Sequence, residues 1–116
     1  MRRIALLLAI ILVVSAPITM SVTANALTIR PQLSFNGTTA NCGVTVVGGL
    51  MSEHIEVEMK LMYGSTCVDS WYADGYGYVS MQEHTSVTKG RTYDLVVTVT
   101  INGVSHTPVS STNTCK

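Results

Sequence analysis

The chain has 116 residues, with seven Lys or Arg and seven Asp or Glu, so its formal net charge is zero. That length suffices for one domain. The balanced charge and the lack of any basic cluster exclude the electrostatic footprint of a nucleic-acid-binding protein.

The first 26 residues have the composition of a secretory signal peptide. Arg2 and Arg3 precede an unbroken apolar run of eleven residues, 4–14. This run is shorter than the roughly 20 apolar residues that span a bilayer, and the small-x-small pattern ANA at 24–26 is typical of a cleavage site. We therefore expect a secreted, extracellular domain, residues 27–116, with five basic and seven acidic residues and no membrane segment.

The 116 − 26 = 90 residues that follow alternate between apolar and polar side chains, with no helical period and no internal repeat. Alternation of this kind, interrupted by Gly and Asn, is typical of β-strands. We predict the first two strands at residues 27–35 and 40–47, with Asn36-Gly37 as their turn. The clearest strand is 54–63, HIEVEMKLMY, whose predicted inward side chains are Ile55, Val57, Met59 and Leu61.

Three further strands follow in the second half of the domain. Residues 67–72 and 77–87 form two short segments, and the Asp74-Gly75 pair between them predicts a turn. Residues 92–101, TYDLVVTVTI, alternate clearly and are rich in β-branched side chains, which favour strands.

The last strand is predicted from a hairpin signal. Asn102-Gly103 favours a type I′ turn, because this turn needs positive φ at both central residues. The chain then returns as residues 104–111. Seven short strands at intervals of about 8–12 residues predict an all-β fold, a single antiparallel seven-stranded immunoglobulin-like sandwich after a cleaved signal peptide.

Residues 87–106, VTKGRTYDLVVTVTINGVSH, resemble the strand-F and strand-G region of fibronectin type III and related immunoglobulin-like modules. The resemblance implies that Tyr93 is a tyrosine corner, whose hydroxyl bonds back to the backbone. Leu95 stands where antibody domains have their second Cys, so the inter-sheet disulfide of those domains is not expected. The layout is also similar to a loose set of small secreted proteins of Gram-positive bacteria, which implies location and fold more than activity.

Three cysteines, Cys42, Cys67 and Cys115, are an odd number for an exported chain. Oxidising conditions favour a disulfide, which in a small domain adds roughly 2–4 kcal/mol. If the strands alternate in direction, all three cysteines lie at one end of the sandwich. We favour a Cys42–Cys115 bond, which leaves Cys67 to pair between molecules in a disulfide-linked dimer; the sequence does not fix the connectivity.

Two tetrapeptides, MSEH at 51–54 and MQEH at 81–84, each place a carboxylate beside an imidazole. The strand map puts His54 and His84 in different sheets and near opposite ends, so we expect no metal site from them. Nor does the chain contain a Gly-x-Ser-x-Gly elbow or a base close to any Cys. We expect no catalytic residue, no enzyme activity and no cofactor.

The segment WYADGYGY, residues 71–78, holds four of the seven aromatic residues of the chain: Trp71, Tyr72, Tyr76 and Tyr78. Tyr76 and Tyr78 are predicted to share one outward face, whereas Trp71 has the opposite parity to Tyr72 and is expected to pack inward. Tyr side chains suit binding surfaces, because they combine a rigid apolar ring with a polar tip. The rings either cover the edge of the sandwich or form a binding site.

These features predict a small secreted, non-catalytic binding or interaction module. Its expected partner is an extracellular glycan or protein. The alternative is a secreted inhibitor or toxin-like effector that uses the same Tyr/Gly loop to fill a site on a protein partner. A third interpretation is a structural unit that assembles through Cys67 or through an open edge strand.

Overall fold

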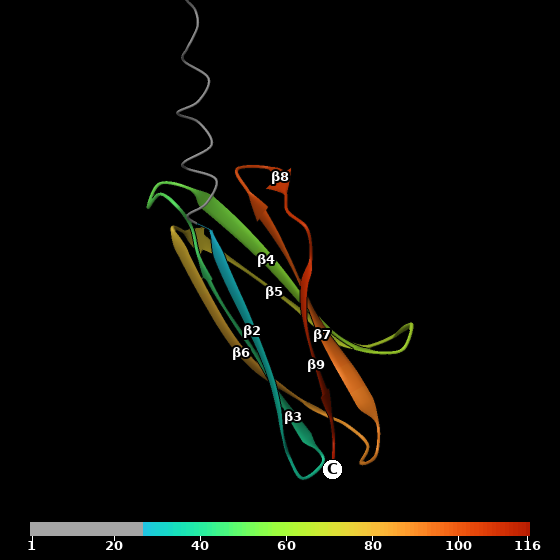
Figure 1. The fold of residues 1–116 in the computed structure, drawn as a ribbon. Helices are drawn as coiled ribbons and strands as arrows, with labels where there is room; N and C mark the ends of the chain where they lie inside the picture. The colour runs from blue at the N-terminus through green and yellow to red at the C-terminus, as the bar shows by residue number, and fades with distance from the viewer. Residues whose placement is uncertain (1–26) are drawn as a thin grey trace, which may run out of the picture.

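The computed structural model describes residues 27–116, which form two antiparallel sheets packed face to face (Figure 1). One sheet has three strands in the order β2-β3-β6: β2 (Thr28–Asn36), β3 (Thr39–Val47) and β6 (Tyr78–Ser86). The other has five: β5 (Thr66–Tyr76), β4 (His54–Tyr63), β7 (Thr92–Ile101), β8 (Val104–Ser105) and β9 (Val109–Thr114). The predicted all-β antiparallel sandwich is confirmed. The predicted signal peptide, residues 1–26, lies outside the described residues.

The core lies between the sheets and follows the alternation of the sequence. Along β4 and β7 every second side chain is buried, and the four inward residues predicted for β4 are all fully buried. Burial of such apolar side chains is the main stabilising term of the fold. The buried core residues of the described chain lie between Leu33 and Cys115, and Leu27 and Ile29 pack against them. No helix occurs among these residues, and so none there is long and apolar enough to cross a membrane.

Residues 27–116 form eight strands rather than the predicted seven. Residues 104–111 were expected as one strand, but the segment is divided into β8 and β9. Ser105 pairs with Thr100 and Val109 with Val97, so β8–β9 has one residue more than β7 over this stretch. The extra residue is a β-bulge, and Pro108 within it lacks the N–H that regular pairing would need.

The predicted turn at Asp74-Gly75 is wrong. Strand β5 continues through both residues to Tyr76, with Gly75 paired to Ile55. A Cβ on Gly75 would lie 3.0 Å from the carbonyl oxygen of Tyr78, so glycine is needed here for close packing of two strands and not for a turn. The chain passes to the other sheet directly after Tyr76, at Gly77, where a φ of 73° favours glycine.

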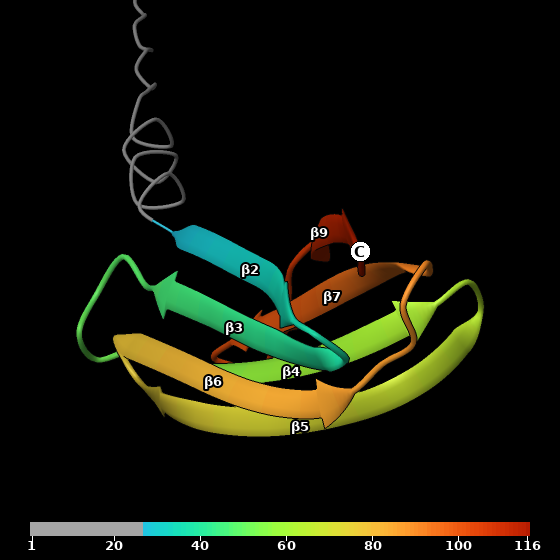
Figure 2. The same ribbon diagram turned by 90° about the horizontal axis from the view of Figure 1, so that it is seen from below.

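The two ends of the sandwich are called here the first and second poles. The first pole consists of loop 48–53, Gly77 and the Asn102-Gly103 turn. The second consists of the turns at Gly37 and Gly64, loop 87–91 and the C-terminus. At the sides, Figure 2 shows β5 beside β6 and β2 beside β9. The Asn113 side chain donates a hydrogen bond of 3.0 Å to the carbonyl of Leu33, which joins the edges of the two sheets.

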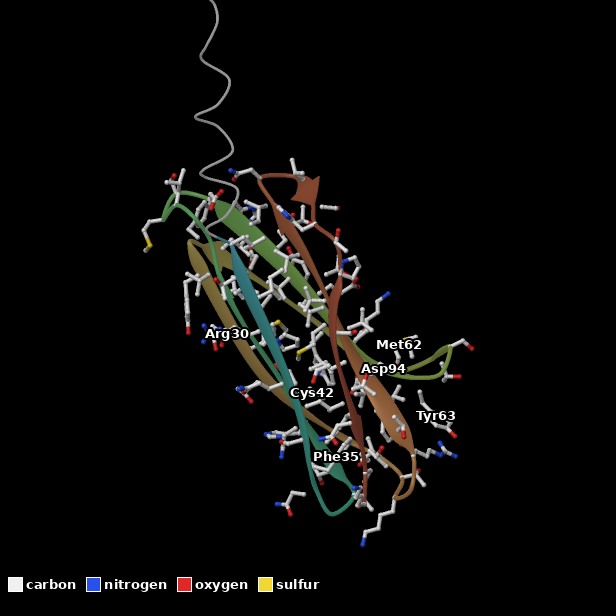
Figure 3. The ribbon with its side chains drawn as sticks, viewed as in Figure 1. Arg30, Phe35, Cys42, Met62, Tyr63 and Asp94 are labelled. Carbon is white, nitrogen blue, oxygen red and sulfur yellow. The ribbon has the colours of Figure 1, made fainter. Side chains whose placement is uncertain are left out.

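The predicted Asn102-Gly103 turn and the tyrosine corner are confirmed at these poles. Asn102 and Gly103 both have positive φ, 49° and 83°, as a type I′ turn requires. At the second pole the backbone N–H of Thr88 donates to the Tyr93 hydroxyl over 2.9 Å. Figure 3 labels Phe35 and Tyr63 near this pole, and both rings pack within 6 Å of Tyr93, at 5.9 and 5.6 Å between centroids.

Candidate functional site

The aromatic segment 71–78 divides between core and solvent. Trp71 is half-buried and packs against the core, as its parity predicted. Tyr72, Tyr76 and Tyr78 are 61, 67 and 53% exposed. Tyr76 ends β5 and Tyr78 begins β6, so the expectation that they share one face of a single strand is wrong. They stand on two different sheets, on either side of Gly77.

Tyr72 lies on the outer face of the five-stranded sheet among acidic side chains. Its hydroxyl donates to a carboxylate oxygen of Glu56 over 3.0 Å. Partial loss of hydration is the largest cause that raises the pKa of Tyr72, followed by this hydrogen bond and by the charges of Glu56 and Asp74. The hydroxyl therefore remains a neutral donor to Glu56 at physiological pH, and the bond holds the ring in one orientation.

A second pair of side chains lies one step further along the same two strands. His54 and Asp74 share a hydrogen bond of 2.9 Å between Nε2 and Oδ2. The His54 ring also packs beside Tyr76, with 5.1 Å between centroids. We call the outward residues His54, Glu56, Glu58, Tyr72 and Asp74 the tyrosine–carboxylate face.

This face is hollowed next to Tyr72. A depression of about 280 Å³ is lined by Glu56, Glu58, Tyr72, Thr98 and Thr100. Cross-strand pairing explains the grouping, because Glu58 lies between Tyr72 on β5 and Thr98 on β7. The walls thus offer one aromatic ring with its hydroxyl, four carboxylate oxygens and two threonine hydroxyl groups. They suit a ligand with several hydrogen-bond donors.

The outer face of the three-stranded sheet has a different character. Its outward side chains are mostly uncharged and polar. Among those of β2, Arg30 carries a full charge. On the five-stranded sheet the outward carboxylates of Glu56, Glu58, Asp74 and Asp94 outnumber Lys60. Arg30 and Asp94, labelled in Figure 3, belong to the two different sheets. Negative charge is therefore concentrated on the side that carries the hollow.

Loop 48–53 at the first pole was not identified as a feature of interest from the sequence. Two backbone hydrogen bonds fix it to Gly77: Gly48 N–H donates to the Gly77 carbonyl and Gly77 N–H to that of Glu53, each over 2.9 Å. Leu50 and Met51 at its tip are 55 and 79% exposed. Two apolar residues next to glycines gave no periodic signal that would have placed them at the surface.

The predicted Cys42–Cys115 disulfide is not formed, and all three cysteines are free thiols. Cys115 is buried at the second pole, where its Sγ donates to the carbonyl of Gly37 over 3.2 Å. Cys42 lies further along that hairpin, opposite Leu33, with its side chain between the sheets (Figure 3). Strand direction placed the cysteines near one end, but it could not show that these two thiols point to different surroundings. Cys67 is exposed.

The histidines lie apart, as the strand map predicted. His54 starts β4 in the five-stranded sheet, whereas His84 is on β6 and bonds Asn41 across the three-stranded sheet over 2.7 Å. His106 follows β8 on the far side of β7 from β4. Within residues 27–116, no three His, Cys, Asp or Glu side chains are grouped so that they could hold a metal ion.

Comparison of the chain with protein-family models and with curated protein sequences gave no match.

Proposed function

We propose that the chain is an exported, non-catalytic binding module of the immunoglobulin-like type, related in layout to fibronectin type III domains. Signal-peptide composition supports export. The strand order supports the module type, because β2-β3-β6 faces β5-β4-β7-β9. Hairpins join β2 to β3, β4 to β5 and β7 to β8, whereas the connections from β3 to β4, β5 to β6 and β6 to β7 pass from one sheet to the other. The tyrosine–carboxylate face is the proposed binding surface.

The observation that carries this proposal is the fixed, exposed ring of Tyr72 beside the hollow. A ring that is 61% exposed and already hydrogen-bonded to Glu56 loses little conformational entropy when a ligand packs on it. The flanking carboxylates accept hydrogen bonds, and such acceptors fix the orientation of a ligand in a site. A structural role alone would not require the ring to project from the sheet.

The chemistry of this surface fits an extracellular glycan. Sugar rings have apolar C–H faces that pack on tyrosine and hydroxyl groups that donate to carboxylates. A protein surface with exposed Lys, Arg or Ser side chains would meet the same acceptors. In both cases the ligand supplies donors, because Glu56, Glu58 and Asp74 supply acceptors.

The test is a titration of the domain, residues 27–116, with a panel of soluble oligosaccharides, monitored by amide chemical shifts in NMR spectra. We expect shifts at Tyr72, Thr98 and Thr100, and their loss in Tyr72→Ala. The matched control is Tyr78→Ala, which removes a similarly exposed ring on the other sheet. Chemical-shift changes that persist in Tyr72→Ala would show that the oligosaccharide binds at another surface of the domain.

A second arm addresses the two tyrosines beside Gly77. Tyr76→Ala combined with Tyr78→Ala should leave the melting midpoint nearly unchanged, because both rings are more than half exposed. If the double variant unfolds, these rings belong to the packing of the fold. If no oligosaccharide shifts any resonance but the domain inhibits a protease or hydrolase at stoichiometric amounts, the inhibitor alternative replaces the glycan proposal.

A further inference from the structure

Exposed apolar side chains gather at the first pole. Among the described residues, nine large apolar or tyrosine side chains are clearly exposed, and six of them surround this pole. They are Val47, Leu50, Met51, Tyr76, Tyr78 and Val104. Grouped exposure of this kind marks interaction surfaces, whereas single exposed apolar residues need no explanation.

The tip of loop 48–53 is held rigidly before any partner arrives. Besides its two bonds to Gly77, the loop is closed by a hydrogen bond of 3.2 Å from Glu53 N–H to the Leu50 carbonyl. Leu50 N–H in turn donates to the Glu53 carboxylate over 2.9 Å. Met51 packs closely over Gly77, because a Cβ added to Gly77 would lie 2.8 Å from the Cα of Met51. Little ordering cost remains when the tip is bound.

The same pole contains a hollow. It has a volume of about 260 Å³, and its lining is mixed, because the polar residues Glu53, Asn102 and His106 contribute to it beside Gly49 and three apolar residues. Its apolar walls come from Leu27, Ile101 and Val104. A Met side chain has four heavy atoms and needs about 120 Å³ if each takes roughly 30 Å³, the share of a water molecule in the liquid. The hollow is therefore large enough for the Met51 side chain.

A projecting apolar tip and a hollow with three apolar residues in its lining make that surface self-complementary. An isologous dimer requires this property, because the same patch of both copies forms the contact. Gly49 and Glu53 of loop 48–53 line the hollow, while Leu50 and Met51 form the tip, so a twofold axis can bring each tip to the other hollow.

Charge at this pole favours a second copy over a lipid surface. Residues 47–54, 74–78 and 101–106 contain no Lys or Arg, so the pole offers no cation to anionic lipid headgroups. Its acidic groups already have partners within the chain: Glu53 accepts from Leu50 and Asp74 from His54. Both carboxylates therefore already accept hydrogen bonds within the chain, although the Leu50 N–H does not neutralise the charge of Glu53.

We propose that two copies of this chain associate pole to pole, with the Leu50-Met51 tip of each copy in the hollow of the other. His54 and Asp74 of the tyrosine–carboxylate face lie at the same pole, but neither forms the tip nor lines the hollow, so the contact does not rest on the proposed ligand binding. A single pole is small, and contacts that bury less than about 1,200 Å² in total are weak and transient. The association should therefore depend on protein concentration.

The test is sedimentation velocity of residues 27–116 under reducing conditions, which prevent disulfide links, between ~10 µM and ~1 mM protein. The wild type should shift from monomer toward dimer as concentration rises. Met51→Asp should remain monomeric, because it places a charge at the tip. The control Val68→Asp introduces the same charge at an exposed apolar residue away from this pole and should behave as the wild type. Melting curves of both variants verify that they fold.

A mixing experiment distinguishes the specific tip–hollow contact from non-specific association of exposed apolar side chains. Met51→Asp loses its tip but keeps its hollow, and Val104→Asp loses its hollow but keeps its tip. Neither should dimerise alone, whereas an equimolar mixture should form heterodimers with one intact tip–hollow contact. A wild type that stays monomeric at the highest concentration overturns the proposal. So does equal loss of association in Val68→Asp, or a mixture that associates no more than its components.

Discussion

The Tyr93 hydroxyl ties the loop before β7 to the strand itself. It accepts the backbone N–H of Thr88, which is partly shielded from water. Tyr93→Phe should lower the free energy of unfolding by about 1 kcal/mol, because that donor loses its partner. Chemical denaturation of the variant measures the change, with Tyr76→Phe as the matched control, since its hydroxyl is at the exposed end of β5. An unchanged midpoint for Tyr93→Phe would remove the tyrosine-corner assignment.

Cys42 is a thiol inside the sandwich. Burial, and to a lesser extent the charge of Asp69, raises its pKa from 9.0 to about 11. Between these two values the unfolded chain ionises this thiol while the folded chain keeps it protonated. The contribution of the protonated Cys42 thiol to the free energy of unfolding is therefore complete below pH 9 and is lost as the pH rises through 11. The change in the free energy of unfolding is on the order of 2 kcal/mol.

Denaturation of wild type and Cys42→Ala at several pH values checks this prediction. Both proteins lose stability at high pH as other groups titrate, but the wild type should lose more between pH 9 and pH 11. Parallel curves for the two proteins would show that the Cys42 thiol ionises equally in the folded and unfolded states.

Single residues also show where sequence reasoning reaches its limit. The inward set of β4 was predicted correctly, because in a sheet with one buried face the side-chain parity is visible in the sequence itself. Tyr72 was identified as a candidate, but its hydrogen bond to Glu56 was not. That bond depends on the pairing of β5 with β4, which no local pattern encodes.

At the scale of elements, Gly77 is the point where the chain passes from one sheet to the other. Gly77→Ala should destabilise the fold more than Gly37→Ala, although both glycines have positive φ, 73° and 63°. Both variants incur the cost of a left-handed Ala, roughly 1–2 kcal/mol. At Gly77 the added Cβ also meets the Met51 backbone at 2.8 Å, whereas nothing lies within 4 Å at Gly37.

The comparison of the two variants by thermal melting isolates the contact with Met51, since the backbone cost is common to both. In Gly77→Ala we also expect amide shifts in loop 48–53, because the loop must move away from the new methyl group. Equal destabilisation of both variants, without shifts in that loop, would show that loop 48–53 is not held against Gly77.

The elements that were predicted least well are those whose geometry depends on partners distant in sequence. Asp74-Gly75 has the composition of a turn, yet the pairing of Gly75 with Ile55 and its close approach to Tyr78 keep both residues in β5. The break between β8 and β9 reflects a bulge against β7. By contrast, the bounds of β4 and β7 matched, since central strands alternate along their full length.

At the scale of the whole molecule, the sandwich is held by packing and hydrogen bonding without a disulfide among its described residues. The melting midpoint should therefore be the same with and without a thiol reductant in freshly purified protein. Calorimetry in the two buffers is the measurement. A lower midpoint with reductant would show that a bond between two of the three cysteines contributes to the fold, contrary to the structure.

The described chain enters the sandwich at the first pole, at Leu27, and reaches Cys115 at the second pole. Tension applied to its two ends would therefore act nearly along the strands. Under such a load the hydrogen bonds between β2 and β3, and between β9 and β7, are sheared together rather than opened one after another. We therefore expect the antiparallel ladder to resist a load applied along the strands.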